Sequence, residues 1–363
     1  FQAEDGIRDF CLSRGLGDVY KRQDIHIGVH RDSPLWHQIA LDWVDWFVDQ
    51  VKSRNIENIL FCGDFFHNRS SVDLTTLQTG AKIIEKLKDF NLLMIAGNHD
   101  SYYKNNASVN SLSPFKGKKN VFVVDETPFI IEDKIKICLC PWGTELESIP
   151  QCDLLIGHFE IQNFKMNQFK VCDHGLGSDS ILDKANFIIS GHFHLREHRK
   201  YPNGKSILYL GSPYEMDFGE RGQVKGFHIL DTDNLEVGFI ENNNTPRHIK
   251  IKISDLLSGN IKPDELPSLL RNNFIAVDVD KKIDTQTLDL IISKFAQHQP
   301  KHVRTDFNIF EQMQLSATEI EEFSFDIDQA LQEFVGLLET EVPKEQILNK
   351  CLEFYKLSLV QNE

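Results

Sequence analysis

The chain has 363 residues, of which 41% are hydrophobic and 26% charged, and its formal net charge is −15. This length allows two domains, or one domain with appendages. The acidic charge argues against a protein that holds nucleic acid by general electrostatics, but it does not exclude an enzyme that meets phosphate through bound metal ions. No apolar run approaches the roughly 20 residues of a membrane span and no signal peptide opens the chain, so we expect a cytoplasmic protein.

Cysteine usage points to the same compartment. The seven cysteines are an odd number, and several lie inside apolar runs such as "ILFCGD" and "KICLCPW". Buried, reduced thiols are typical of cytoplasmic proteins, whereas a disulfide framework would need pairing at regular spacings. The scattered positions are Cys11, Cys62, Cys138, Cys140, Cys152, Cys172 and Cys351.

The first 23 residues do not share the pattern of the rest. They contain no starting Met and no sustained hydrophobic period, and they run directly into "DIHIG". We interpret residues 1–23 as a foreign segment, with a natural irregular terminus as the alternative. An apolar strand should lead into Asp24, and it is missing or replaced by "LGDVYKRQ", which leaves the placement of Asp24 and His26 in doubt.

From Leu35 onward the periodicity alternates between helix and strand. Apolar residues at helical spacing predict a helix from Leu35 to Arg54 and an amphipathic one from Asp73 to Phe90. The runs "NILFCGD" and "LLMIAGNHD" predict buried strands that end in Gly and polar residues. Six further predicted strands follow: "VFVV", "PFIIEDKIKICLC", "DLLIGH", "NFIISGHFH", "SILYLGS" and "GFHILD". The order predicts an α/β fold, a layered sandwich with two sheets inside and helices outside.

The sequence changes in character near Ile249. The segments "NNFIAVDVD", "DTQTLDLIISKF" and "HVRTDF" predict a small strand–helix–strand unit. After Gln312 the pattern is helical, with Pro343 at a helix start. In "IDQALQEFVGLL" one helix face carries Ile327, Leu331, Phe334 and Leu337 or Leu338. Such a face fits a partner groove or coiled coil, and it equally fits packing against its own domain.

Polar residues follow the predicted strands at each strand end. In open α/β sheets, sites collect at the carboxyl ends of the strands, where glycines let the backbone bend sharply. Singly, each cluster has an ordinary structural explanation, such as a turn for "GD" or a core histidine for His158. Together, five clusters in order are hard to produce by chance. They contain Asp24, His26, Asp64, Asn98, His99, Asp100, His158, His192 and His194.

These residue types suit a pair of divalent cations. Mn²⁺ accepts mixed imidazole and carboxylate ligands, and two such ions about 3.5–4 Å apart activate water and clamp a phosphoryl centre. A carboxylate at a strand end, such as Asp64, is suited to bridge the ions. His99 could act as a protonated imidazole toward a leaving oxygen, with its other nitrogen held by Asp100.

The motifs DxH, GDxxH, GNHD, GH and GHxH, in this order, resemble the signature of the calcineurin-like metallophosphoesterases. Finer segments are similar to the nuclease subunit of SbcCD-type DNA repair complexes, in particular its phage-type branch. These segments are "DIHIG", "CGDFFHNR", "AGNHD", "PWG", "GHFEI", "SGHFHLRE", "LGSPYEMDFGE", "GHFEIQNFKMNQFKVCDHGL" and "ENNNTPRHIKI". The similarity is detailed from Asp24 to about Ile251.

The resemblance implies a role for each residue. Asp24, His26 and His194 would bind the first metal, Asn98, His158 and His192 the second, and Asp64 would bridge them. His99 would act on the leaving group, Asp100 would orient it, and His67 would help to place the DNA phosphate. The implied cofactors are two Mn²⁺, with Mg²⁺ or another divalent ion as alternatives, and the implied architecture is a four-layer α/β/β/α sandwich.

The resemblance also implies a domain plan and partners. A nuclease domain would span 24–252, a small α+β capping domain that recognises DNA 253–312, and helices that bind an SbcC-type ATPase 313–363. A homodimer is implied as well, for which Trp36, Trp43 and Trp46 are surface candidates that fit a core equally well. The expected function is exo- and endonucleolytic hydrolysis of phosphodiesters at DNA ends, in recombination and double-strand-break repair. The alternatives are a phosphoesterase for small diesters or phosphoproteins, and a catalytically impaired scaffold subunit.

Overall fold

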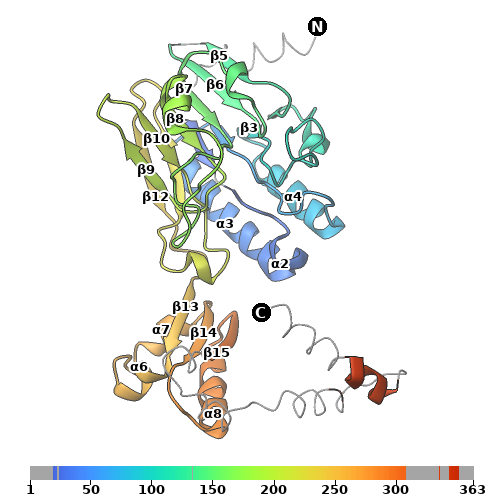
Figure 1. Cartoon of the computed structure of the whole chain (residues 1–363), viewed down its shortest axis with the longest axis vertical. Helices are drawn as coiled ribbons and strands as arrows, with labels where there is room; N and C mark the ends of the chain where they lie inside the picture. Colours follow the sequence, from blue (N-terminus) through green and yellow to red (C-terminus); the bar gives the residue numbers. More distant parts are fainter. Residues whose placement is uncertain (1–18, 23, 133, 308–334, 336–342, 351–363) are drawn as a thin grey trace.

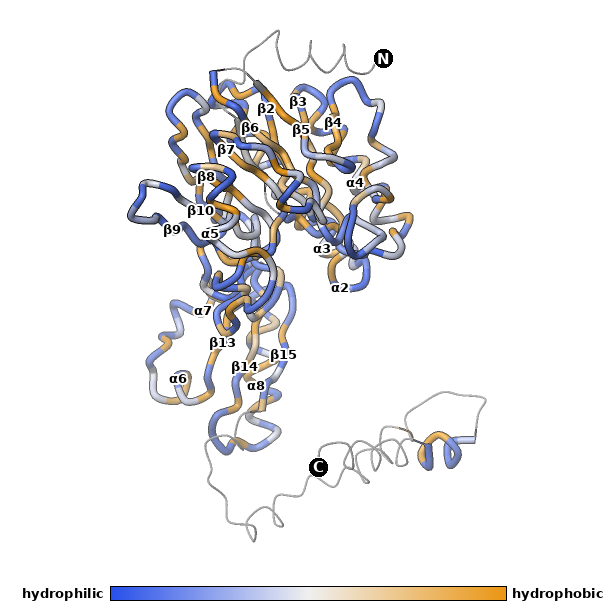
Figure 2. The backbone as a smooth tube through the Cα atoms, turned by 45° about the horizontal axis from the view of Figure 1, so that its top comes forward, coloured by the Kyte–Doolittle hydropathy of each residue, from blue (hydrophilic) through white to orange (hydrophobic). Residues whose placement is uncertain are grey.

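A computed structural model describes residues 19–22, 24–132, 134–307, 335 and 343–350. Figure 1 shows a larger unit built around two stacked sheets and a smaller unit below it, which begins at β13. Hydrophobic residues run along the strands inside the larger unit, as Figure 2 shows. The fold is therefore α/β, with mixed sheets and helices, as the sequence predicted.

The first sheet has six strands in the order β12-β11-β1-β2-β3-β4. Strands β1 to β4 run parallel to one another, whereas β11 and β12 are antiparallel additions at one edge. The strands are β1 (Val19–Arg22), β2 (Asn58–Phe61), β3 (Asn91–Ile95), β4 (Val121–Val124), β11 (Gly226–Leu230) and β12 (Val237–Glu241).

The second sheet has the order β5-β6-β7-β8-β10-β9. Its four central strands are parallel, and the edge strands β5 and β9 are antiparallel to their neighbours. The strands are β5 (Phe129–Glu132), β6 (Lys136–Cys140), β7 (Cys152–Gly157), β8 (Ala185–Ser190), β9 (Glu197–Lys200) and β10 (Ser206–Tyr209). Strands β9 and β12 were not predicted. The sequence of β9 has no apolar run, and no residue of β12 is fully buried.

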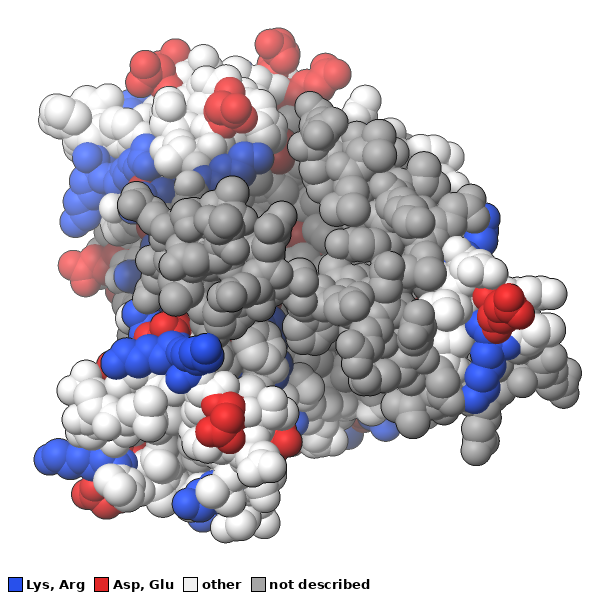
Figure 3. Space-filling model, turned by 60° about the horizontal axis from the view of Figure 1, so that its bottom comes forward, with Lys and Arg blue, Asp and Glu red and all other residues white. Residues whose placement is uncertain are grey.

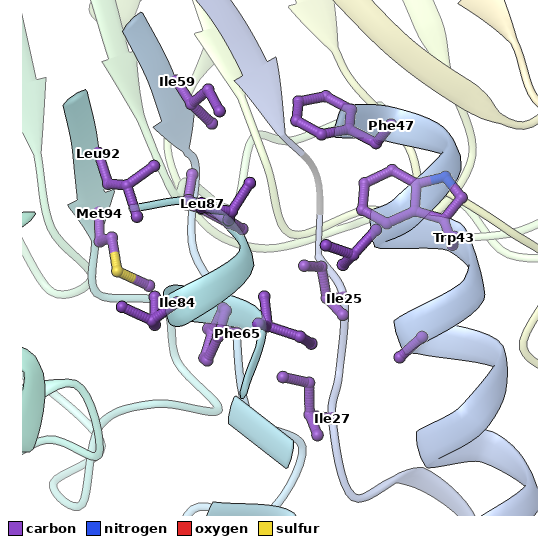
Figure 4. Packing of buried hydrophobic residues seen from close by; sticks show 14 of the residues in the cluster. Ile25, Ile27, Trp43, Phe47, Ile59, Phe65, Ile84, Leu87, Leu92 and Met94 are labelled. Atoms are coloured by element: carbon purple, nitrogen blue, oxygen red, sulfur yellow. The ribbon is translucent and has the colours of Figure 1, made fainter. Parts of the chain in front are cut away.

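Side chains alternate between the two faces of each strand, so the apolar residues of the larger unit form three clusters, one between each pair of neighbouring layers. On β2, Ile59 and Phe61 face the helices α3 (Pro34–Lys52) and α4 (Leu74–Lys86), whereas Leu60 faces the second sheet. Figure 4 shows the helix-side layer, where Trp43 and Phe47 lie close to Ile25. The outer face of the second sheet is covered by loops and the short helix α5 (Ser178–Leu182). The predicted four layers are present, but the fourth contains little helix.

The three candidate surface tryptophans belong to this core. Trp43 is fully buried and Trp36 is 6% exposed, while Trp46 is half-buried against the same layer. The amphipathic spacing of α3 was compatible with these tryptophans lying either on a dimer surface or in the core. The structure assigns these rings to packing in the described protomer.

Strand β1 settles whether "LGDVYKRQ" can lead into the site. Its backbone pairs in parallel with β2 and antiparallel with β11, so that it fills the middle of the first sheet. Of the two alternatives, a missing strand and a strand replaced by this segment, the described residues agree with the second. Hydrogen bonding to two neighbours defines this strand in spite of its polar composition.

The smaller unit has three parallel strands, β13 (His248–Lys252), β14 (Phe274–Val279) and β15 (His302–Phe307). β13 pairs in parallel with β14, so the sheet of this unit includes residues from His248 onward. Its helices are α6 (Ile253–Ser258), α7 (Leu266–Leu270) and α8 (Thr285–Ala296). The ring of Trp36 stacks on Phe274 of β14 at 5.1 Å, which packs the unit against α3.

The remaining elements are short. They are the turn α2 (Val29–Asp32) and the 3₁₀ helices η1 (Ser113–Phe115), η2 (Leu146–Ser148) and η3 (Phe218–Glu220). Residues 344–350 are helical and directly follow Pro343, which confirms the predicted start. The proposed partner-binding face of Ile327, Leu331, Phe334, Leu337 and Leu338 lies outside the described residues.

Two expectations from composition can be compared with the described part of the chain. All five of its cysteines are free thiols, and four of them are buried. None of its helices combines the length and the apolar character that crossing a bilayer requires.

Candidate dinuclear metal centre

The predicted ligands converge where the central strands of both sheets end. Asp24 follows β1 and Asp64 follows β2, while His158 and His192 follow β7 and β8 of the other sheet. Two groups of three side chains each bring their ligand atoms within 4.8 Å of one another. The groups are Asp24, His26 and His194, and Asp64, His158 and His192.

In the first group, possible metal-binding atoms of Asp24, His26 and His194 lie close together. The Nε2 atoms of His26 and His194 lie 2.9 Å apart. Oδ2 of Asp24 accepts a hydrogen bond from the His192 backbone N–H at 2.9 Å. Its other oxygen, Oδ1, is buried and has no hydrogen-bond partner. A buried carboxylate oxygen without a donor is costly unless a cation faces it, so this group fits a metal ion.

The second group contains a neutral oxygen ligand. Oδ1 of Asn98 lies 2.8 Å from His158 Nε2 and 2.9 Å from His192 Nδ1. Oδ2 of Asp64 lies 3.3 Å from His158 Nε2 and 3.5 Å from His26 Nε2. Asp64 therefore faces both groups with one carboxylate, which is the geometry of a ligand shared by two cations.

The hydrogen bonds of the rings determine which nitrogen can bind metal. Nδ1 of His158 lies 2.7 Å from the carbonyl oxygen of Cys62. A carbonyl oxygen only accepts, so Nδ1 carries a hydrogen and Nε2 is the nitrogen that can bind a metal. Ligand histidines in metal sites are held in this way by a partner on the other ring nitrogen.

Glu220 holds His194 in the same manner. Its Oε1 lies 2.6 Å from His194 Nδ1, which leaves Nε2 for a metal. Its Oε2 contacts Lys225 Nζ at 2.7 Å and accepts from Ser212 at 3.0 Å. Both charged side chains are buried, at 7% and 2% exposure. Burial raises the pKa of Glu220, but the bonds to His194 and Lys225 outweigh it and lower the pKa, so the group is a carboxylate.

Glu160 holds His192 from the other side. Its Oε1 lies 3.2 Å from His192 Nε2, which leaves Nδ1 facing Asn98. The same oxygen lies 3.3 Å from Nε2 of His174, and His174 Nδ1 contacts Asp173 at 2.8 Å. His174 is half exposed, so this chain of contacts reaches solvent.

In the metal-free protein, burial and neighbouring charges shift the pKa values of the ligands in different directions. Burial lowers the pKa of His26 well below its usual range, which keeps the ring neutral. Burial also raises the pKa of Asp24 to about 7. Burial would lower the pKa of His158, but the facing Asp64 carboxylate raises it to about 9. For Asp64 burial is likewise outweighed, and His158 lowers its pKa. A cation displaces protons from such ligands when it binds.

Three of the ligands have a left-handed backbone conformation. His26, Asp64 and His192 have φ values of 51°, 50° and 84°. Residues with side chains rarely adopt this left-handed region, at a cost of about 1–3 kcal/mol each, and such strain clusters at functional sites.

Two glycines allow the ligands to pack this tightly. A Cβ at Gly63, where φ is +111°, would lie 2.0 Å from His158 Nδ1. A Cβ at Gly191 would lie 2.4 Å from the Cys62 carbonyl oxygen and 2.8 Å from Asp24 Oδ1. Only glycine fits either position without moving a ligand.

Asp100 does not hold the His99 ring, which corrects one expectation. Its carboxylate accepts from the backbone N–H groups of Phe65, Phe66 and Gly97 at 2.9–3.2 Å. Nδ1 of His99 instead lies 2.6 Å from the carbonyl oxygen of His67. Asp100 thus ties the loops after β2 and β3 together, and burial raises its pKa to about 7.

His67 lies beside the first ligand group. Its ring stacks on His99, with centroids 5.3 Å apart and planes at 21°. Nδ1 of His67 lies 3.3 Å from Nδ1 of His26. His67 therefore contacts one nitrogen of the His26 ring, and His194 contacts the other. Arg69 Nε donates to the Asn98 carbonyl oxygen at 2.9 Å and holds that ligand in place.

A cleft of about 370 Å³ opens beside the second group. Its walls include His158, Glu160 and Trp142, together with Lys104 and Asn105. The Trp142 ring lies 5.3 Å from the His192 ring, centroid to centroid. The cleft gives a substrate a route to the second ligand group.

Comparison with known proteins agrees with this geometry. The family model for calcineurin-like phosphoesterase matches residues 24–196, which contain every ligand described above. Over this range the chain is similar to the calcineurin-like phosphoesterases. It is also a distant homologue of "Exonuclease subunit 1" of Enterobacteria phage T4. The two are 29% identical over 236 residues, which cover 61% of this chain and 67% of the relative.

Solved structures with a similar arrangement were also found. A dimetal phosphatase from Danio rerio is 11% identical, with a TM-score of 0.40, over 60% of this chain and 92% of that one. A hypothetical protein from Thermus thermophilus is 13% identical, with a TM-score of 0.36, over 62% of this chain and 99% of that one.

Sequence reasoning missed the residues that support the ligands. Glu160, Glu220 and Lys225 hold two ligand rings, and Trp142 lines the cleft. A signal existed for three of them, because "PWG", "GHFEI" and "LGSPYEMDFGE" were among the resembling segments. The segments alone do not indicate which histidine each carboxylate faces.

Proposed function

We propose that this protein is a Mn²⁺-dependent DNA nuclease subunit that hydrolyses phosphodiester bonds at DNA ends. The observation that carries the proposal is the Asp64 carboxylate, which faces two complete donor groups and can serve two cations at once. The phage relative is named an exonuclease subunit, which supports nucleic acid as the substrate class.

Each ligand would have a defined place. Asp24, His26 and His194 would hold one ion, Asn98, His158 and His192 the other, and Asp64 both. Mixed imidazole and carboxylate donors suit Mn²⁺, and other divalent ions are alternatives. Bound ions of this kind supply Lewis acidity and lower the pKa of water for attack on phosphorus.

The residues outside the donor groups would handle the substrate. Nδ1 of His99 donates to the His67 carbonyl oxygen, so Nε2 is the atom free to protonate or bond the leaving oxygen. His67, stacked on His99, would place a phosphate oxygen. Asp100 would act indirectly, by fixing the loops that carry Asp64 and His99.

The wider assembly follows from the same proposal. The unit that begins at β13 would cap the DNA cleft, and residues 313–363 would bind an ATPase of the SbcC type that controls access to duplex ends. The nuclease would act as a homodimer in recombination and double-strand-break repair, in the cytoplasm of the host cell if a phage encodes it.

The direct test is Mn²⁺-dependent release of nucleotides from end-labelled linear duplex DNA. The chain is compared with Asp64→Ala, which removes the shared ligand, and with Asp45→Ala, which removes an exposed carboxylate on α3. We expect release by the chain and by Asp45→Ala, and none by Asp64→Ala.

Two results would contradict the proposal. Release that persists in Asp64→Ala would place the nuclease activity elsewhere or in a contaminant. Absence of release, together with Asp64-dependent hydrolysis of bis(p-nitrophenyl) phosphate, would favour a phosphoesterase for small diesters.

A further inference from the structure

A hairpin between β7 and α5 stands out among the described loops. Residues 163–172 fold back on themselves, with Cys172 N–H donating to Phe164 O at 2.8 Å and Met166 N–H to Lys170 O at 2.9 Å. At the tip, Oδ1 of Asn167 accepts from the backbone N–H groups of Phe169 and Lys170, both at 2.9 Å. These bonds order the tip without help from a hydrophobic core.

The base of the hairpin is connected to the second ligand group. Just before it lies Glu160, which contacts His192, and just after it lies His174, which contacts the same carboxylate. Leu176 N–H donates to the Glu160 carbonyl oxygen at 2.8 Å and closes the base. The cleft beside His158 runs along this base, because Glu160, Gly175 and Leu176 are among its walls.

The tip of the hairpin reaches toward the first ligand group. Gln168 Nε2 donates to the Arg221 carbonyl oxygen at 2.9 Å. Arg221 directly follows Glu220, the carboxylate that holds His194. The hairpin therefore spans from the support of one ligand group to the support of the other.

The exposed side chains at this tip combine an aromatic ring with positive charge. Phe169 is 85% exposed, the largest exposed fraction among the large hydrophobic residues of the described chain. Lys165, Lys170 and Arg221 are exposed around it, and in the described part of the chain none of them forms an ion pair. Elsewhere on the surface, Figure 3 shows short groups of Lys and Arg side chains between Asp and Glu side chains on the face that it views.

We propose that this hairpin is a nucleic-acid contact, in which the Phe169 ring stacks on an unpaired base while Lys165, Lys170 and Arg221 contact the flanking phosphates. The inference rests on the proposed nuclease function and names the part of the substrate that it holds, a single-stranded segment next to the scissile bond. Aromatic rings set among cations bind single strands regardless of sequence, because every base has a face to stack on.

A protein partner fits these observations less well. A docking face would bury a contiguous apolar patch, whereas Phe169 is an isolated ring on a narrow tip with exposed lysines around it. A base is the ligand that a single exposed ring can hold, and phosphates are the groups that unpaired lysines and arginine recognise.

The test measures binding of a short single-stranded oligonucleotide containing 2-aminopurine, with the full chain and Ca²⁺ in place of Mn²⁺. The variants are Phe169→Ala, Phe169→Tyr, the double variant Lys165→Gln/Lys170→Gln, and Leu74→Ala, a control that removes a side chain 80% exposed on α4. All are surface changes, so thermal unfolding is expected to stay unchanged.

We expect Phe169→Ala to weaken binding roughly 5- to 100-fold and to abolish 2-aminopurine quenching, while Phe169→Tyr and Leu74→Ala retain both. The double lysine variant should lower the slope of log K against log salt by about 1.4, which is about 0.7 for each phosphate that is no longer neutralised. Hydrolysis of bis(p-nitrophenyl) phosphate, which needs no stacked base, should be unchanged in all of them.

Other outcomes separate the two proposals. If the parent chain cleaves DNA but Phe169→Ala binds and cleaves it equally well, the hairpin inference is overturned and the nuclease proposal stands. If Phe169→Ala loses only affinity for the partner ATPase, the tip is a protein contact and the inference is wrong. If the parent chain neither binds nor cleaves DNA, both proposals fail.

Discussion

The two histidines of "HFH" show how one task is met in two environments. Both rings are oriented by a carboxylate on the nitrogen that faces away from the site, Glu220 for His194 and Glu160 for His192. Glu220 is buried and ion-paired with buried Lys225, whereas Glu160 leads through His174 to solvent. The contrast teaches that the two metal positions are supported unequally, and mutations should reveal it.

The largest effect should come from the ligand that belongs to both groups. Asp64→Ala removes an oxygen that faces His158 and His26 at once. We expect the loss of Mn²⁺ affinity at both positions to exceed the roughly 10- to 100-fold that follows loss of an outer-shell partner. Calorimetric titration with Mn²⁺ measures it. Retention of one high-affinity ion would show that Asp64 serves a single position.

The second largest effect should come from Glu220, the buried carboxylate that holds His194. Glu220→Ala frees the His194 ring and leaves the Lys225 ammonium buried without its partner. We expect Mn²⁺ affinity at one position to fall by roughly 10- to 100-fold, and the free energy of unfolding of the metal-free protein to fall by about 3–5 kcal/mol. Urea unfolding and calorimetry measure the two effects.

A conservative variant guards against loss of the fold. Glu220→Gln keeps a carbonyl oxygen for His194 but removes the charge that faces Lys225. Metal affinity should therefore be affected less than stability. If both variants were as stable as the parent chain, the Glu220–Lys225 ion pair would contribute nothing to the free energy of unfolding.

A smaller effect should come from Glu160, the partly exposed carboxylate that holds His192. Glu160→Gln keeps an acceptor for His192 and breaks contacts to a half-exposed histidine. Mn²⁺ affinity should fall by about tenfold or less, with a stability change below about 1 kcal/mol, because partly exposed pairs are screened by solvent. The measurements are those used for Glu220. A stability loss as large as that of Glu220→Ala would contradict the proposed asymmetry.

The pH dependence should be the smallest and most graded effect. Asp24 and Asp100 have their pKa raised to about 7 by burial, so the folded protein keeps protons that the unfolded chain releases above about pH 4. At these two carboxyls the folded state then binds more protons across this window, so the stability that they contribute to the metal-free protein should fall as pH rises from about 4 to 7.

Histidine titration opposes part of this trend within the window. Burial lowers the pKa of His26, so below about pH 6.5 the unfolded chain binds a proton there that the folded protein does not, and the stability contributed by His26 grows as pH rises. The raised pKa of His158, about 9, gives a stabilisation that is fully present below about 6.5 and is lost only as pH rises toward 9. Mn²⁺ needs the Asp24 carboxylate, so stabilisation by Mn²⁺ should grow with pH over the same range. Melting temperatures with and without Mn²⁺ test both trends. Stabilisation by Mn²⁺ that stays constant from pH 4 to 7 would contradict this coupling.

The sequence predicted the site better than its support. Strands carry regular patterns that end in a recognisable way, so the positions of Asp64, Asn98 and His158 followed from local runs. The partners Glu160 and Glu220 come from loops 26 or more residues away from the rings they hold. No local pattern encodes that distance.

Two departures from the local sequence pattern share a physical cause. Asp100 is next to His99 in sequence, yet the loop turns its carboxylate toward the N–H groups of Phe65 and Phe66. The segment Val19–Arg22 lacks an apolar pattern, yet pairing on both sides makes it the central strand. In both cases tertiary hydrogen bonds overrode the expectation drawn from neighbouring residues.

The central claim is that one carboxylate joins two cation positions, and electron paramagnetic resonance during Mn²⁺ titration tests it most directly. We expect two Mn²⁺ bound per chain, with a spectrum of two exchange-coupled ions that disappears in Asp64→Ala. A single bound ion, or two ions with independent spectra, would contradict it.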